Sequence, residues 1–263
     1  MNTLNWADWN PFALKDDLRY VWDRIPAGGI TMLVADSGIG KSMLAQHLAI
    51  SLAQGRNEFL GKQLDGKTRQ VIYVDLEGTP TSTKQRLFQM GLNTEDLDRL
   101  HFKRPRGFRV EEHIADLVNE AEQLKPDLIV IDSFAASHRL LENDHASMQK
   151  YFDDHLRLLT EASPNTAVVL LAHTNKTEGG KTAQSTDWHL KYRGSSAIWA
   201  AVDCVYCLGK STKGQLALMN TKSKDASAAD ILLLEIDVKA GGLSPIKTTT
   251  NGGQNEIHVP TLA

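Results

Sequence analysis

Short apolar runs alternate with helical patterns along most of the chain. Four runs share an aliphatic, β-rich composition, at 30–35, 70–76, 128–131 and 167–172. Four stretches between them have the patterns of helices, at 41–54, 79–91, 111–124 and 147–161. A weaker strand is predicted at 100–102. Strands without polar alternation are typical of parallel sheets buried on both faces. The pattern therefore predicts an α/β fold, with a mostly parallel twisted sheet and helices on both faces.

The last third of the chain has a different pattern. Three strand-like runs follow one another at 204–208, 215–221 and 231–238, with turns rich in glycine or lysine between them. Consecutive strands with short turns favour antiparallel pairing. We therefore expect an antiparallel C-terminal extension of the main sheet.

The domain organisation follows from the absence of repeats and low-complexity linkers in the 263 residues. We expect one domain over 26–263, preceded by an N-terminal arm over 1–25. The arm is rich in aromatic residues, namely Trp6, Trp9, Phe12, Tyr20 and Trp22. It can pack on its own domain or on a neighbouring subunit.

Composition narrows the class of protein. The chain is 41% hydrophobic and 23% charged, as soluble globular proteins are. No apolar run approaches the roughly 20 residues that cross a bilayer, and the N-terminus does not resemble a signal peptide. We therefore expect a cytoplasmic protein without a membrane partner. A formal net charge of −3 argues against broad electrostatic wrapping of DNA but leaves local basic loops open.

Cys204 and Cys207 form a CxxC pair, which can indicate zinc or redox chemistry. A zinc site needs a second pair of ligands, and none has suitable spacing. Side chains three apart on a strand face opposite sides. The pair is therefore predicted to be two buried strand residues.

A glycine-rich turn follows the first apolar run and precedes the first helix. Its sequence, from Ala35 to Ser42, is Ala-Asp-Ser-Gly-Ile-Gly-Lys-Ser, a P-loop with Ala in place of the first Gly. Backbone N–H groups of such a loop form an anion nest at a helix N-terminus. Lys41 would reach the β and γ phosphates of ATP, and Ser42 would hold Mg²⁺. The predicted nucleotide-binding residues are Ser37, Gly38, Ile39, Gly40, Lys41, Ser42 and Met43.

Two carboxylates at strand ends complete the predicted site. Asp132 ends the strand 128–131, and a Walker-B aspartate at that position holds Mg²⁺. Ser133 follows it, so the glutamate that some ATPases place there is not available. Glu77, which follows the neighbouring strand, is the candidate base that orients water. Asp75 is less suitable because it lies within the strand.

A glutamate on the second strand, beside this P-loop and Walker B, is a RecA-like feature. The chain resembles the RepA-type plasmid replicative helicases, which form hexameric rings, from about residue 26 to residue 240. The matching pieces are ADSGIGKSMLAQHLA, VIYVDLEG, LIVIDSF, ENDHASM, LLAHTNK and YRGSSAI. The resemblance implies a RecA-like ATPase, with ATP and Mg²⁺ as its cofactors and a hexamer as its assembly.

The resemblance also implies roles for single residues. Glu77 would be the catalytic base, and His173, after the strand 168–172, would sense the γ-phosphate. Arg193 would be the arginine finger that one subunit supplies to the ATP of the next. Lys222 would be a second basic residue reaching across that interface. Without the resemblance, Arg193 could equally be a surface residue at a helix start, and His173 could simply bond to the backbone.

The segment 176–192 is long for a loop, and long loops are often functional. In RecA-like rings the loop at this position lines the central channel. We expect Lys176, Lys181 and Lys191 to contact DNA phosphates and Trp188 to stack on a base. A solvated loop without that role is the alternative.

These observations lead to one expected function and its alternatives. The expected function is an ATP-hydrolysing, ring-forming DNA helicase or translocase of the RepA type, acting in the replication of a replicon. One alternative is a RecA-like ATPase of recombination or repair. The other is a nucleotide-gated regulator or loader that hydrolyses little ATP.

Overall fold

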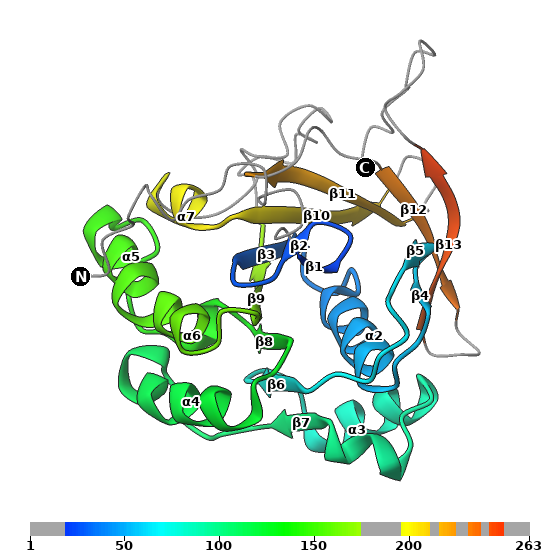
Figure 1. Cartoon of the computed structure of the whole chain (residues 1–263). Coiled ribbons are helices and arrows are strands. Elements are labelled where there is room, and N and C mark those ends of the chain that lie inside the picture. Colours follow the sequence, from blue (N-terminus) through cyan, green and yellow to red (C-terminus); the bar gives the residue numbers. More distant parts are fainter. Residues whose placement is uncertain (1–18, 175–195, 211–215, 225–230, 238–241, 250–263) are drawn as a thin grey trace, which may run out of the picture.

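The computed structural model describes residues 19–174, 196–210, 216–224, 231–237 and 242–249 (Figure 1). One large sheet runs through the centre, and helices cover both of its faces. The helices are α2 (Lys41–Ala53), α3 (Pro80–Gln89), α4 (Val110–Leu124), α5 (His145–Tyr151), α6 (Arg157–Ala162) and α7 (Ser196–Ala201). Short 3-10 turns lie at Thr94–Asp98 and Ala135–Ser137, and a π-helical turn at Phe152–Leu156.

Within the described ranges, the large sheet has nine strands in the order β13-β12-β11-β10-β3-β9-β8-β6-β7. Their bounds are Gly242–Thr249, Ile231–Asp237, Leu216–Ser223, Cys204–Lys210, Ile30–Ala35, Ala167–His173, Leu128–Asp132, Val71–Asp75 and Leu100–Lys103. The six strands from β10 to β7 run parallel to one another. The strands β11, β12 and β13 continue the sheet with antiparallel pairing.

The predicted α/β fold with an antiparallel C-terminal extension is therefore confirmed. The first of the three predicted runs, β10, also pairs in parallel with β3, and the described residues add the strand β13 after the third run. The predicted helix over 147–161 is interrupted, because α5 passes into the π-helical turn before α6 begins. The helix α3 has the predicted start, with the Thr79 side chain accepting a hydrogen bond from the Ser82 N–H at 3.4 Å and Pro80 at its first position.

The apolar strand residues divide between two cores. On β3, Ile30, Met32 and Val34 pack into the core that includes apolar residues of α4–α6, while Leu33 and Ala35 pack into the core that includes α2. This division follows from the two-residue period of a strand. Cys204 and Cys207 are both buried, one in each core, so the prediction of two separated strand cysteines is confirmed.

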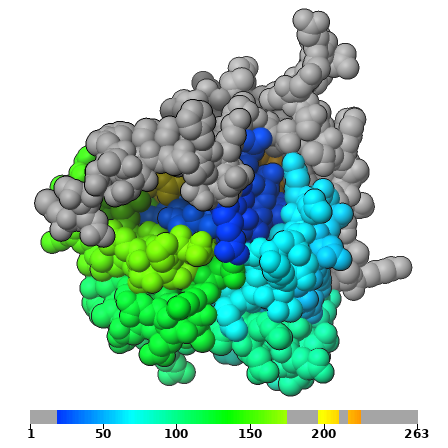
Figure 2. Space-filling view, in the orientation of Figure 1, coloured from blue at the N-terminus to red at the C-terminus, as the bar shows by residue number. Residues whose placement is uncertain are grey.

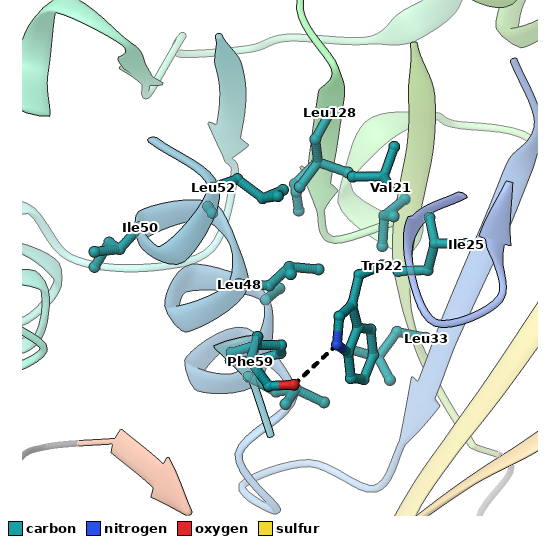
Figure 3. Packing of buried hydrophobic residues seen from close by; sticks show 14 of the residues in the cluster. Val21, Trp22, Ile25, Leu33, Leu48, Ile50, Leu52, Phe59 and Leu128 are labelled. Carbon is teal, nitrogen blue, oxygen red and sulfur yellow. Dashed lines mark hydrogen bonds between the residues drawn. The ribbon is translucent and has the colours of Figure 1, made fainter. Parts of the chain in front are cut away.

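A small N-terminal hairpin, β1 (Tyr20–Trp22) with β2 (Ile25–Pro26), packs on the α2 side of the sheet. The Trp22 side chain is buried, and its Nε1 donates a hydrogen bond to the Phe59 carbonyl at 3.0 Å (Figure 3). Phe59 belongs to a second hairpin, β4 (Glu58–Phe59) with β5 (Lys62–Gln63). In Figure 2 the blue residues of the first hairpin lie between the green helices and the cyan residues of this region.

The end of the predicted arm therefore packs on its own domain at Trp22. Trp6, Trp9 and Phe12 lie outside the described residues. The boundary at residue 25 stays a prediction.

Candidate active site

The P-loop connects the central strand β3 to α2. Gly38 has a φ of 79° and Gly40 a φ of 111°, a region that residues with a Cβ rarely adopt. The Gly40 carbonyl accepts the first helical hydrogen bond from the Leu44 N–H at 2.9 Å. The N–H groups that begin α2 have no partner within the helix, so they can bind an anion. The loop thus has the backbone path that a phosphate site requires.

Asp132 ends β8 beside this loop and is buried. Its Oδ2 accepts a hydrogen bond from the Tyr73 hydroxyl at 2.8 Å, while its Oδ1 is buried and has no hydrogen-bond partner among the described residues. Burial raises the pKa of Asp132, and the neighbouring Ser42 hydroxyl and Lys41 ammonium act in the opposite direction. A buried carboxylate oxygen without a partner, close to a hydroxyl, fits the hard oxygen ligands that Mg²⁺ prefers. Ser42 and Asp132 would hold that ion.

Glu77 lies just beyond the end of β6, next to the ends of β8 and β9. The Ser133 hydroxyl donates a hydrogen bond to its Oε1, and the His173 Nε2 lies 3.7 Å from its Oε2. The Glu77 side chain is 45% exposed, so water can reach the carboxylate. Strands that are neighbours in the sheet thus bring Glu77, Ser133 and His173 together, although they are far apart in the sequence.

The register of the sheet explains this convergence. Asp75 pairs with Asp132 across β6 and β8, and Ala35 pairs with His173 across β3 and β9. The carboxyl ends of neighbouring parallel strands meet at one edge, where α/β proteins bind their ligands. Glu77, Asp132 and His173 therefore lie along the same edge as the P-loop.

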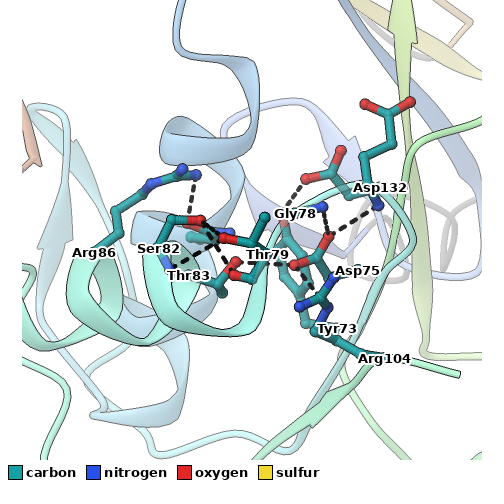
Figure 4. A network of polar contacts seen from close by, with 11 residues as sticks. Tyr73, Asp75, Gly78, Thr79, Ser82, Thr83, Arg86, Arg104 and Asp132 are labelled. Carbon is teal, nitrogen blue, oxygen red and sulfur yellow. Dashed lines mark hydrogen bonds and ion pairs between the residues drawn. The ribbon is translucent and has the colours of Figure 1, made fainter.

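Asp75 occupies a position different from that of Glu77. It is buried, and its carboxylate oxygens contact the turn after β6, Thr83 and Arg104 (Figure 4). These contacts engage the carboxylate within the protein. Glu77 is the more accessible of the two carboxylates for a reacting water.

His173 ends β9, and its Nδ1 is buried with no hydrogen-bond partner in the part of the chain that the structure describes. The next residue, Thr174, donates its hydroxyl to the carboxylate of Asp36 in the P-loop. The β9 end is therefore attached to the P-loop on one side and to Glu77 on the other. Sensing of a γ-phosphate by His173 stays a prediction.

Lys222 on β11 is engaged within its own chain. Its ammonium group donates to the carbonyls of Trp199 and Val202, the second at 2.6 Å, and lies 5.4 Å from the centre of the Trp199 ring. Burial lowers the pKa of Lys222, and Lys224 lowers it further. These contacts stabilise the end of α7. A role for Lys222 at the nucleotide of a neighbouring subunit stays a prediction.

The remaining predicted site residues lie outside the described residues. They are the arginine-finger candidate Arg193 and the DNA-contact candidates Lys176, Lys181, Trp188 and Lys191. Their roles stay predictions.

Sequence reasoning missed two residues of the site. The sequence pattern gives Ser133 no role beyond standing where some ATPases have a glutamate, and it gives Tyr73 none beyond its place in a strand. The usable signal was the alternation of β6, which puts Tyr73 on the same face as Asp75. The contact between Ser133 and Glu77 spans 56 residues, and no local pattern encodes it.

None of the helices in the described part of the chain has the length and apolar character that spanning a bilayer requires.

The fold and the family are shown by comparison with known proteins. The structure is similar to a KaiC-like protein from the hyperthermophilic archaeon Pyrococcus horikoshii, with a TM-score of 0.61 and 15% sequence identity. The match covers 88% of this chain and 100% of that one. At this identity the likeness supports the RecA-like fold alone.

A family model described as an AAA domain matches residues 4–179, about two thirds of the chain. The chain therefore belongs to this AAA domain family, AAA_25, and is a RecA-like P-loop ATPase.

Proposed function

We propose that this protein is a ring-forming motor that hydrolyses ATP to move along single-stranded DNA, as the RepA-type helicases do. The observation that carries the proposal is the position of Glu77. Its carboxylate is accessible to water, contacts Ser133 and His173, and lies at the sheet edge that carries the P-loop. A regulator that used ATP only as a switch would not need a base held in this way.

The chemistry assigned to each residue follows from charge and reach. Lys41 and the P-loop N–H groups bind and orient the phosphates. Glu77 accepts the proton of the attacking water and aligns that water with the γ-phosphate. Ser42 and Asp132 would hold Mg²⁺, which would supply positive charge beside the phosphate oxygens. Arg193 of one subunit stabilises the transition state in the next subunit of the ring.

DNA contact is proposed on the resemblance to the RepA-type helicases and on the lysines and the tryptophan of the segment 176–192. Three lysines and Trp188 provide phosphate contacts and a stacking surface. Several copies of this segment in one channel would bind DNA although the whole chain has a net charge of −3.

The test combines hydrolysis with assembly. ATP hydrolysis is measured with and without single-stranded DNA for the wild type, Lys41→Ala and Glu77→Gln, and the mass in solution is measured with a non-hydrolysable ATP analogue. Lys67→Ala, an exposed lysine in the loop before β6, is the control. We expect DNA to stimulate the wild type and the control, and Lys41→Ala to be inactive. Glu77→Gln should bind ATP but lose about 10²–10⁴-fold in kcat.

The alternatives predict other results. If the protein is a monomer and DNA does not change its rate of ATP hydrolysis, the ATPase assignment stands and the helicase proposal is excluded. If the wild type hydrolyses ATP slowly and Glu77→Gln functions normally, the nucleotide-gated regulator is favoured. Filaments that pair strands without unwinding would favour the recombination ATPase.

A further inference from the structure

A buried carboxylate close to the proposed site has no part in the chemistry described above. Asp75 ends β6, two residues before Glu77, and only 3% of its surface is exposed. A buried charge is unfavourable unless neighbouring groups compensate it. Its contacts therefore indicate what its position requires.

The Asp75 carboxylate binds the turn that carries Glu77. Its Oδ1 accepts hydrogen bonds from the backbone N–H of Glu77 at 3.2 Å and from that of Gly78 at 2.7 Å. Both donors belong to the two residues that follow Leu76. The backbone of the turn is thus folded around one carboxylate oxygen (Figure 4).

The second oxygen attaches the same carboxylate to two other elements. Asp75 Oδ2 accepts a hydrogen bond from the Thr83 hydroxyl on α3 at 3.1 Å. The Arg104 Nε, just beyond β7, lies 3.6 Å from the same oxygen. The guanidinium of Arg104 can only donate, so an amide nitrogen in the place of Oδ2 would place a second donor against it, whereas the Thr83 hydroxyl could rotate to accept.

The turn leaves no room for a side chain at Gly78. A Cβ added to Gly78 would lie 2.5 Å from Asp75 Oδ2 and 2.7 Å from the Thr83 hydroxyl. Contacts this short force something to shift. The absence of a side chain at Gly78 is therefore what lets the turn close on the carboxylate.

We propose that Asp75 is a positioning residue for Glu77, and the inference rests on the proposed role of Glu77 as the base. Asp75 fixes the Glu77 backbone, which leaves the Glu77 carboxylate beside Ser133 and His173. The negative charge of Asp75 is needed because Oδ2 pairs with the guanidinium of Arg104. Ser133 and His173 thus contact the Glu77 carboxylate, and Asp75 holds the Glu77 backbone.

The test uses Asp75→Asn in the full chain, because asparagine keeps the size and the Oδ1 acceptor but loses the charge. We expect kcat for ATP to fall about 10²-fold, the loss typical of a small misplacement of a reacting group. KM for ATP should stay unchanged, because the P-loop is not altered.

The matched control is Asp65→Asn. Asp65 also accepts from the N–H two residues later, that of Lys67 at 3.2 Å, and pairs with an arginine, Arg69. It lies in the loop before β6, so its substitution should leave kcat at the wild-type value.

A double-mutant cycle with Glu77→Gln separates positioning from general structural damage. If Asp75 acts through Glu77, Asp75→Asn causes no further loss of kcat in the Glu77→Gln background. An equal fold-loss in both backgrounds, or a rise in KM that accounts for the loss, overturns the inference.

Two outcomes separate this inference from the function on which it rests. If Asp75→Asn has the wild-type kcat while Glu77→Gln has lost most of its kcat, the positioning role of Asp75 is overturned and the role of Glu77 as the base stands. Wild-type kcat in Glu77→Gln overturns the base assignment and this role with it. If Asp75→Asn does not fold, Thr83→Val removes one contact of Oδ2 and should lower kcat about tenfold, a barrier change of about 1.4 kcal/mol; wild-type kcat in Thr83→Val would then refute the role.

Discussion

Removing the hydroxyl of Ser133 is the smallest change that tests how Glu77 is held. Ser133 is completely buried, and its hydroxyl donates to Glu77 Oε1. Ser133→Ala removes one oxygen atom and leaves the backbone at the end of β8 unchanged. The Glu77 carboxylate would lose that hydrogen bond and could leave the position beside His173.

The size of the effect follows from the environment of this hydrogen bond. A hydrogen bond to a charged group contributes about 1.5–3 kcal/mol. The Glu77 side chain is 45% exposed, so water replaces part of the lost hydrogen bond. The lower end of that range, about 1.5 kcal/mol, therefore applies. If the bond must be present in the transition state, about 1.5 kcal/mol corresponds to roughly a tenfold loss of kcat.

The assay is steady-state ATP hydrolysis beside thermal unfolding and nucleotide binding. Ser137→Ala is the matched control, because Ser137 is also fully buried after β8 but its hydroxyl contacts Phe134 and Tyr151. We expect Ser133→Ala to lose about tenfold in kcat with unchanged ATP binding, and Ser137→Ala to lose stability without that loss. Equal kcat in Ser133→Ala and wild type would refute the reasoning.

Three further predictions concern the metal site, the core and pH. Tyr73→Phe removes the hydroxyl that contacts Asp132, so about tenfold more Mg²⁺ should be needed for half-maximal hydrolysis; an unchanged requirement would contradict this. Trp22→Ala removes a buried indole and its hydrogen bond to Phe59, so urea unfolding should show a loss of about 3–5 kcal/mol. Burial, followed by the charge of Arg56, lowers the pKa of His47 to about 4. The unfolded chain then binds more protons, so stability falls as the pH drops from about 6.5 to 4, and His47→Gln should flatten this fall in denaturation curves.

The fold was largely predictable because the apolar runs obey local rules. The run 128–131 has no polar residue and lies between two other strands of the sheet, as its composition predicts. The cap at Thr79 and the left-handed glycines of the P-loop also follow from residue type and its nearest neighbours.

The contacts within the site were less predictable because they join distant segments. Asp132 and Glu77 could be placed at one sheet edge from their strands alone. The contact between Ser133 and Glu77 depends on β6 and β8 being neighbours in the sheet. The sequence does not state the order of the strands. Lys222 similarly contacts α7 because β10 and β11 pair in one particular register.

The position of β3 has a consequence for the dynamics of the protein. β3 pairs with β9 on one side and with β10 on the other, so both rows of its backbone hydrogen bonds are formed. Its amide protons should therefore exchange with solvent only when the whole sheet opens, whereas those of the edge strand β7 can exchange through local opening. In a hydrogen-exchange experiment, the amides of β3 should exchange most slowly, and the phosphate loop begins where that strand ends. Nucleotide would bind directly after the strand in which spontaneous opening is rarest.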